Sequence, residues 1–341
     1  MKILLFADLH MCPRASIINK WGTLYPIRLE NCINSMNWLE RTAVETGCDC
    51  IISLGDFFDK PDLTSETITA SKDILWSSLK HYHLVGNHDA SNSSLEFNSV
   101  NSLRCENQQI VSEPLVIDLG DCELCFLPYI VDYDRKPLIE YFSEKTDKRR
   151  VILSHNDIMG IQLGPIISKT GFSIEEIESN CDLFINGHLH NGQKISNKII
   201  NLGNLTGKDF GENAAKYEHK IAILDTKTLD LTFIENPHAF NFYKIQIDSE
   251  NDLKLLQSLK NNAVVSLKCN NTILEATRLT LETLKDKVIE SRIIIIKNQE
   301  MSDDTTTLDL SVDHLARFIE CCKTTIENTS LLDEELAEIC K

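Results

Sequence analysis

The chain is organised around Leu84-Val85-Gly86-Asn87-His88-Asp89, where an apolar run ends in a glycine and then in an amide, an imidazole and a carboxylate. Gly86 allows the backbone to turn sharply where a side chain would clash. The polar residues after it then project from a loop at the end of a strand, where α/β sheets usually carry their chemistry. A single tetrapeptide of this kind is weak support for a functional site. The support is stronger if other apolar runs in the chain also end in polar residues.

The same construction recurs along the first two-thirds of the chain. Continuous apolar runs at 2–7, 50–54, 151–153 and 182–185 are typical of buried strands. Helical patterns at 27–46, 64–80 and 173–179 alternate with these strands, and 115–119 with 122–131 is expected to form a hairpin. Alternating helices and buried strands imply parallel crossovers, so we expect all the polar strand ends at one edge of a sheet.

Seven of the strand-end side chains are of the types that bind metal ions. Mixed Asp, Asn and His ligands without cysteine suit Mn²⁺, Fe²⁺ or Zn²⁺. Seven ligands are too many for one catalytic ion, so we expect two ions about 3.5–4 Å apart that share a carboxylate. Asp56 is the expected bridge because it is the one acid that stands alone at a central strand end. We assign Asp8, His10 and His190 with Asp56 to the first metal, and Asn87, His155 and His188 to the second.

His88 follows a predicted ligand but is not needed as one. With Asp89 to orient its ring, it is the candidate general acid for the leaving oxygen. Water or hydroxide held between two such ions is a strong nucleophile, and the ions neutralise the charge of a phosphoryl group. The predicted reaction is therefore the hydrolysis of a phosphoester.

The motifs that carry this interpretation resemble those of the calcineurin-like metallophosphoesterase superfamily. They are, in order, Asp8-Leu9-His10, Gly55-Asp56, Gly86-Asn87-His88-Asp89, His155 and Gly187-His188-Leu189-His190. Their separations, and the tract Asn201-Leu202-Gly203-Asn204, are similar to those of the SbcD-type subunit of double-strand-break repair nucleases and of large-bacteriophage recombination endonucleases. One departure is Asp59, where some members carry a histidine, and the role of that position stays open.

The resemblance implies a metallophosphoesterase β-sandwich flanked by helices and Mn²⁺-dependent exonuclease and endonuclease activity on DNA. It also implies an SbcC-type coiled-coil ATPase as partner and a homodimer. By the same resemblance, 1–238 would be the nuclease domain, 239–300 a small α/β capping domain, and 301–341 a linker with C-terminal helices. The β-α-β-α-β pattern of 242–296 agrees with this division. The helices expected at 311–328 and 331–340 either dock on the ATPase or pack on their own domain.

Composition places the chain among soluble globular proteins. Of its 341 residues, 42% are hydrophobic and 25% are charged, and no stretch approaches the length of a membrane span. The apolar run at 3–7 is too short for the core of a signal peptide. The 12 cysteines are scattered, which favours reduced thiols and a cytoplasmic location, that of the host if a phage encodes the chain. Cys122 and Cys125 are expected to be buried thiols.

The net charge of −17 argues against a protein that holds nucleic acid by its overall field. Contact with DNA would have to be local, and 11–36, with Arg14, Lys20, Trp21, Tyr25 and Arg28, is a candidate for contact with DNA or a second subunit. Two alternatives stay open: a metallophosphatase or phosphodiesterase acting on a nucleotide, small molecule or phosphoprotein, and a non-catalytic scaffold. Five further histidines lack motif context and are expected at the surface or in packing: His81, His83, His219, His238 and His314.

Overall fold

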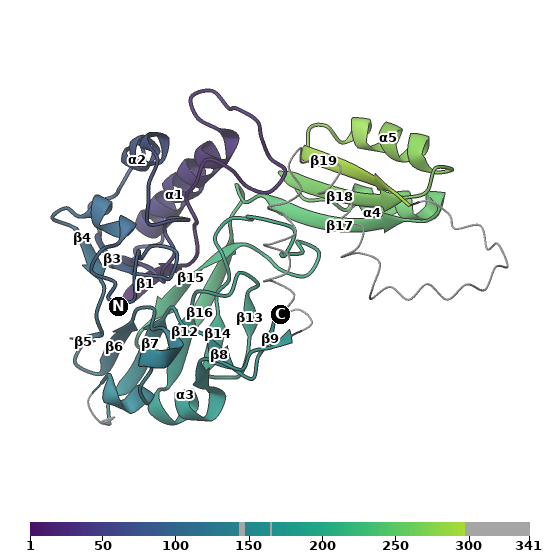
Figure 1. Cartoon of the computed structure of the whole chain (residues 1–341). Coiled ribbons are helices and arrows are strands. Elements are labelled where there is room, and N and C mark those ends of the chain that lie inside the picture. The colour runs from purple at the N-terminus through teal and green to yellow at the C-terminus, as the bar shows by residue number, and fades with distance from the viewer. Residues whose placement is uncertain (143–146, 164–165, 297–341) are drawn as a thin grey trace, which may run out of the picture. The chain divides into compact units, whose positions relative to one another are not determined.

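The computed structural model describes residues 1–142, 147–163 and 166–296 (Figure 1). The chain divides into two compact units, Met1–Lys297 and Asn298–Lys341. The C-terminal helices predicted at 311–328 and 331–340 lie outside the described residues.

Two six-stranded sheets form most of this unit, which confirms the predicted α/β sandwich. The first has the order β16 (Leu231–Glu235), β15 (Lys220–Asp225), β1 (Lys2–Phe6), β2 (Cys50–Ser53), β3 (Lys80–Leu84), β4 (Gln108–Val111). The second has the order β13 (Gln193–Lys194), β14 (Ile199–Asn201), β12 (Leu183–Asn186), β7 (Arg149–Ser154), β6 (Cys122–Leu127), β5 (Leu115–Asp118). The central strands of both sheets run parallel.

Strand β1 shows why these strands read as continuously apolar. Its side chains alternate between two cores, as successive residues of a strand must. Leu4 and Phe6 pack against helix α1 (Ile27–Glu45) on the outer face of the first sheet. Ile3 and Leu5 pack against the second sheet. Helix α3 (Ile174–Asn180) covers the outer face of the second sheet.

The prediction of one sheet edge is wrong in one respect, because the polar strand ends come from two sheets. The ends of β1, β2 and β3 belong to the first sheet, and those of β7 and β12 to the second. A strand that is buried on both faces has the same apolar pattern in either sheet, so the pattern does not assign it to one. The sandwich nevertheless brings the polar ends together, as the distances below show.

Helix α2 is shorter than the predicted 64–80 and spans Ser65–Lys72. It begins at Thr64, whose hydroxyl accepts a hydrogen bond from the Thr67 N–H at 3.3 Å. Asp73 ends the helix and accepts a hydrogen bond from the Tyr25 hydroxyl at 2.6 Å. The chain then turns so that Trp76 stacks on Phe57, with ring centroids 6.0 Å apart.

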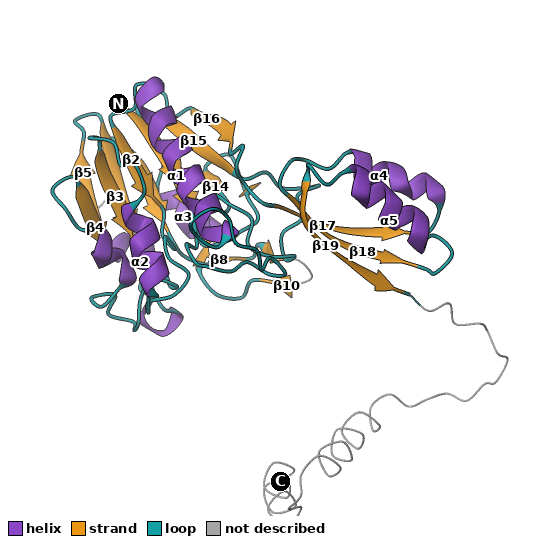
Figure 2. Ribbon diagram, turned by 90° about the horizontal axis from the view of Figure 1, so that it is seen from above, coloured by secondary structure: helices purple, strands orange, loops and turns teal. Residues whose placement is uncertain are grey.

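A third, parallel sheet follows the sandwich and has the order β17 (Asn241–Ile247), β18 (Ala263–Cys269), β19 (Val288–Ile295). Helices α4 (Lys254–Gln257) and α5 (Leu274–Thr283) lie on one face of this sheet, as Figure 2 shows. The 3-10 turn η4 (Glu250–Leu253) directly precedes α4 in the chain. The order of these elements agrees with the predicted β-α-β-α-β unit. The domain boundary near residue 238 stays a prediction.

Short elements complete the first unit. The 3-10 turns are η1 (Ser99–Leu103), η2 (Asp132–Asp134) and η3 (Leu138–Glu140), and the two-residue strands are β8 (Ile158–Met159), β9 (Gln162–Leu163), β10 (Ile166–Ile167) and β11 (Phe172–Ser173). Among the described residues, no helix combines the length and the apolar character needed to cross a membrane. Cys122 and Cys125 are buried free thiols, as predicted, and they pack into different cores.

Candidate metal centre

Four of the predicted ligands adopt a backbone conformation that L-residues rarely use. Asp8 has φ 51°, His10 φ 45°, Asp56 φ 51° and His188 φ 71°. Hydrogen bonds between neighbouring strand ends hold this geometry, from the Asp8 N–H to the Gly55 carbonyl (3.1 Å) and from the His10 N–H to the Asp56 carbonyl (3.0 Å). Backbone strain of this kind persists where the surrounding fold imposes it, and it is frequent at functional sites.

The residues assigned to the first metal lie together. Donor atoms of Asp8, His10 and His190 are within 4.8 Å of one another. The Nε2 atoms of His10 and His190 are 2.9 Å apart, and His10 Nε2 is 3.7 Å from Asp56 Oδ2. Asp8 and His10 are fully buried.

The residues assigned to the second metal form an adjoining group. Asp56, His155 and His188 bring donor atoms within 4.8 Å of one another. His155 Nε2 is 3.2 Å from Asp56 Oδ2, and the Asn87 amide oxygen is 3.1 Å from His155 Nε2 and 2.9 Å from His188 Nδ1. Asp56 thus lies between the two groups, where a bridging carboxylate is expected. The structure brings all seven predicted ligands together, while their roles as ligands stay a prediction.

The donor set fits two divalent cations. Asp8 and Asp56 are both buried, and carboxylates this close repel each other unless positive charge lies between them. Burial and the proximity of Asp56 raise the pKa of Asp8, against the opposing effect of the histidines. Burial alone would lower the pKa of His155, but Asp56 raises it to about 9. In metal-binding proteins such a carboxylate–imidazole set is completed by the cation itself.

Each of the four predicted histidine ligands also has a polar partner close to its other ring nitrogen, through a hydrogen bond for His155 and His188 and at ion-pair distance for His10 and His190. His10 Nδ1 is 3.3 Å from Asp59 Oδ1, and His190 Nδ1 is 3.2 Å from Glu212 Oε1. His188 Nε2 is 3.1 Å from Asp157 Oδ1, and His155 Nδ1 is 2.6 Å from the Leu54 carbonyl oxygen. Partners of this kind fix the tautomer and orientation of a metal-binding imidazole, so the remaining nitrogens face the common centre.

Sequence reasoning missed these carboxylate partners. Asp59 has no role predicted from the sequence, and it pairs with Lys208, whose Nζ is 2.5 Å from Asp59 Oδ1. Asp157 follows a predicted ligand by two residues, and Glu212 lies in the loop after the Asn201–Asn204 tract. The distance between the tract and Glu212 follows no motif spacing, so the sequence holds no local signal for its contact with His190.

His88 lies beside the centre, and its ring is held differently from the prediction. His88 Nδ1 is 3.0 Å from the backbone carbonyl of Asp59, and its N–H donates to Asp56 Oδ1 at 2.9 Å. Asp89 instead accepts hydrogen bonds from the backbone N–H groups of Phe58 (2.9 Å) and Gly86 (3.0 Å). Burial raises the pKa of Asp89 to about 8. Asp89 therefore shapes the loop, and the predicted orientation of His88 by Asp89 is wrong.

Gly86 is required by close packing. A Cβ atom there would lie 2.1 Å from Asp56 Oδ1, inside the carboxylate predicted to bridge. Gly55 has φ +100°, and a Cβ there would lie 2.3 Å from His155 Nδ1. Both glycines therefore let the backbone approach the site closely enough to place its side chains.

Arg28 is not a surface contact, contrary to the expectation for 11–36. Its guanidinium is fully buried and donates to the carbonyl oxygens of Leu9 (2.9 Å) and Gly207 (3.0 Å) and to the Thr206 hydroxyl (2.5 Å). It therefore ties the loop after β1 to the loop after β14. Trp21, by contrast, is 70% exposed.

The histidines without motif context behave as expected where they are described. His81, His83 and His219 are buried in packing contacts; His81 Nε2 lies 2.9 Å from Glu40 Oε1 and His83 Nε2 lies 2.5 Å from Gln108 Oε1. His314 lies outside the described residues.

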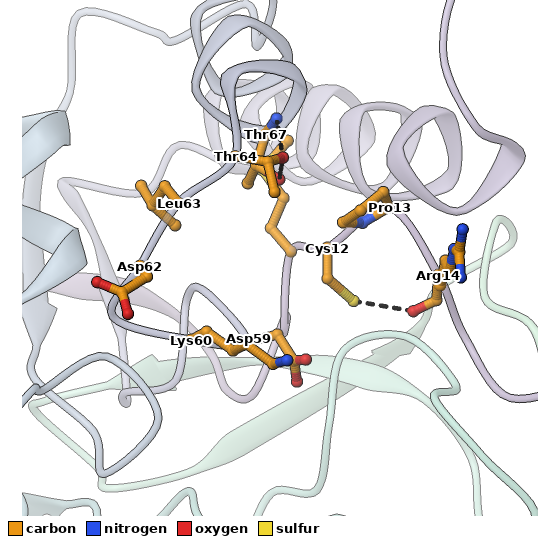
Figure 3. A pocket seen from close by; sticks show the side chains of 10 residues that line it. Cys12, Pro13, Arg14, Asp59, Lys60, Asp62, Leu63, Thr64 and Thr67 are labelled. Atoms are coloured by element: carbon orange, nitrogen blue, oxygen red, sulfur yellow. Dashed lines mark hydrogen bonds between the residues drawn. The ribbon is translucent and has the colours of Figure 1, made fainter.

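A pocket of about 200 Å³ opens next to Asp59 (Figure 3). The segment Met11–Arg14 lines one side of it, and residues of 59–67 line the other. Its lining combines the cations Arg14 and Lys60 with the carboxylates Asp59 and Asp62 and with apolar side chains. The pocket gives space beside the first metal group.

A family model and several solved structures are similar to this chain. The family model described as calcineurin-like phosphoesterase matches residues 1–192. No curated protein matches the chain. Similar solved structures include a dimetal phosphatase from Danio rerio (13% identity, 69% of this chain and 98% of that chain covered, TM-score 0.39). Others are the calcineurin-like phosphoesterase YfkN from Bacillus subtilis (10%, 84% and 98%, 0.39) and the phosphoesterase Yfce from E. coli (11%, 69% and 100%, 0.32).

Proposed function

The chain belongs to the calcineurin-like phosphoesterase family, a family of metal-dependent phosphoesterases, and on that premise we propose that it is an SbcD-type DNA nuclease subunit. The proposed reaction is the hydrolysis of phosphodiester bonds in DNA during double-strand-break processing or recombination. The observation that carries the hydrolytic part is the set of four histidines, each with a polar partner close to one ring nitrogen and with the other ring nitrogen facing a common centre.

Two bound divalent ions would supply an activated water and neutralise charge on the phosphoryl group. The residues of the chain supply the rest. Asp8, His10 and His190 would hold one ion and Asn87, His155 and His188 the other, with Asp56 between them. When the His88 ring is protonated, Nδ1–H donates to the Asp59 carbonyl and Nε2–H is the proton available to the leaving oxygen.

A local cationic surface supports a nucleic acid as the substrate. The face of β17–β19 opposite helices α4 and α5 carries Lys244, Lys268 and Arg292 around a hollow of about 430 Å³. DNA phosphates attract such clusters even where the net charge of the chain is −17. Binding of DNA by the isolated chain would then be weak and strongly dependent on salt.

The proposal includes partners by the resemblance of the motifs. An SbcC-type coiled-coil ATPase would dock on 301–341 and supply most of the DNA contact, and a homodimer would place two sites on one DNA. Mn²⁺ is the proposed metal. Tight DNA binding at about 200 mM salt without the ATPase would contradict this division of labour.

The test is hydrolysis with Mn²⁺ of linear duplex DNA and of bis-p-nitrophenyl phosphate, by the wild-type protein and His88→Ala. We expect the wild type to degrade DNA, and His88→Ala to bind metal but to lose this activity. Turnover of the small diester alone, with DNA intact even beside a candidate ATPase, would favour the alternative of a phosphatase or phosphodiesterase acting on a small molecule, nucleotide or phosphoprotein. The acidic net charge favours that alternative. Bound metal with no hydrolysis of either substrate would indicate a non-catalytic scaffold.

A further inference from the structure

We infer that the loop between β14 and β15, residues 204–214, positions the first metal group, and that it does so only while it is anchored on the three-stranded sheet β17–β19. This inference deepens the proposed function and rests on it, because it concerns the regulation of the same centre. Lys208 and Glu212 are the positioning residues, and Phe210 is the anchor.

The loop holds both histidines of the first metal group. Glu212 Oε1 lies 3.2 Å from His190 Nδ1, and Lys208 Nζ lies 2.5 Å from Asp59 Oδ1, which in turn lies 3.3 Å from His10 Nδ1. The partners of the second group come from elsewhere, since His155 is held by Leu54 and His188 by Asp157. The loop therefore acts on one metal group and not on the other.

Internal hydrogen bonds link Lys208, Glu212 and the start of the loop to one another. The Glu212 carboxylate accepts hydrogen bonds from the Lys208 N–H (3.1 Å) and from the Asn204 side chain (2.7 Å). The Asn204 N–H donates to the His190 carbonyl at 3.1 Å. A displacement at any point of the loop is thus transmitted to Lys208 and Glu212 together.

The three-stranded sheet anchors the loop between these two residues. The buried Phe210 ring packs edge-on against Phe242 of β17, with centroids 5.1 Å apart. The Arg292 guanidinium of β19 lies 4.7 Å from the centre of the same ring and donates to Ser266 of β18 at 2.8 Å. The Ala214 N–H also donates to the Phe242 carbonyl at 2.9 Å. All three strands of the sheet therefore contact or support the anchor.

The same sheet carries the cationic face described above, and Arg292 belongs to both the face and the anchor. A polyanion bound to that face would compete with the Phe210 ring for Arg292. The geometry thus connects occupancy of the sheet to the affinity of the first metal group.

The test measures Mn²⁺ binding by isothermal titration calorimetry in the full chain, without DNA. Two backgrounds separate the groups: His188→Ala retains the first group, and His190→Ala retains the second. We expect Phe210→Ala to weaken Mn²⁺ binding about tenfold in the His188→Ala background, the loss typical of a disturbed ligand partner. In the His190→Ala background we expect no change.

Matched variants guard against a general loss of folding. Arg292→Gln acts from the sheet side and should weaken the first group alone, whereas Phe210→Leu keeps an apolar anchor and should restore much of the affinity. Phe97→Ala, at a phenylalanine that is 64% exposed, should change neither group. Equal losses at both groups, or no loss at either, would overturn the inference. Wild-type protein that binds no Mn²⁺ would overturn the proposed function as well, which distinguishes the two failures.

Discussion

At the scale of single residues, a backbone carbonyl holds the His88 ring, as one also holds His155, and His88 differs from the four predicted ligand histidines in its predicted role as the general acid. We expect His88→Ala to slow the hydrolysis of a diester with a poor leaving group by about 10²–10⁴-fold, the usual contribution of a general acid. The loss should be much smaller for p-nitrophenyl esters, whose leaving group needs no proton. Steady-state rates on the two kinds of ester check this, and equal losses on both would contradict the role.

Arg28 gives a prediction about stability. Truncation in Arg28→Met would leave the buried acceptors of His10, Thr206 and Gly207 without the donor that the guanidinium supplies. Each unsatisfied buried group costs about 1–3 kcal/mol, so we expect the free energy of unfolding to fall by about 3 kcal/mol or more. Urea denaturation measures the difference. Arg14→Met, at an exposed arginine of the same segment, is the control and should leave the midpoint unchanged.

The limits of sequence reasoning are also clearest at single residues. The seven predicted ligands could be found because each follows a buried strand, and the strand pattern is local. Lys208 and Glu212 could not be found in this way, because their partners Asp59 and His190 are brought to them by the folding of the two sheets. The predicted role of Asp89 is wrong because its carboxylate, although next to His88 in the sequence, does not contact the His88 ring. The local sequence pattern predicts which side chains reach the centre. Contacts between distant segments decide which residues orient those side chains.

At the scale of elements, the turn after β3 depends on the absence of a side chain at Gly86. In Gly86→Ala the new Cβ would displace the Asp56 carboxylate, from which it would lie only 2.1 Å away. We expect loss of Mn²⁺ binding at both groups with an unchanged far-ultraviolet circular dichroism spectrum. The control is Gly120→Ala, because Gly120 has φ +93° and open space around the position of a Cβ atom. This variant should be less stable through backbone strain but should retain Mn²⁺ binding.

The elements themselves were predicted unevenly. Order and type were predicted for the strands around the centre, since unbroken apolar runs such as 3–7 and 151–153 are distinctive. The division of these strands between two sheets was not predicted, because an apolar run that is buried on both faces has the same sequence pattern in either sheet. The end of α2 was missed because the contact of Asp73 with Tyr25, 48 residues away in the chain, helps to define it.

At the scale of the whole molecule, stability should depend on pH through the buried His83. Burial lowers the pKa of His83 to about 4, from 6.5 in a solvated chain. Below pH 6.5 the His83 imidazole is protonated in the unfolded chain but stays neutral in the folded chain. The free energy of unfolding therefore falls as the pH drops toward 4. Glu40, His81 and Gln108 surround this histidine. In His83→Gln the thermal midpoint should fall less steeply over this range, and parallel curves for the two proteins would contradict the assignment.

The left-handed backbone of the ligand residues has a consequence for how the protein balances durability against activity. A non-glycine residue in this conformation costs about 1–3 kcal/mol, and Asp8 also buries a charge beside Asp56. Asparagine tolerates this conformation as aspartate does, but it carries no charge. Metal-free Asp8→Asn should therefore melt at a higher temperature than the metal-free wild type, although it binds Mn²⁺ poorly, and a lower melting temperature would refute this. At position 8, the side chain suited to holding a cation is then the one that makes the metal-free protein less stable.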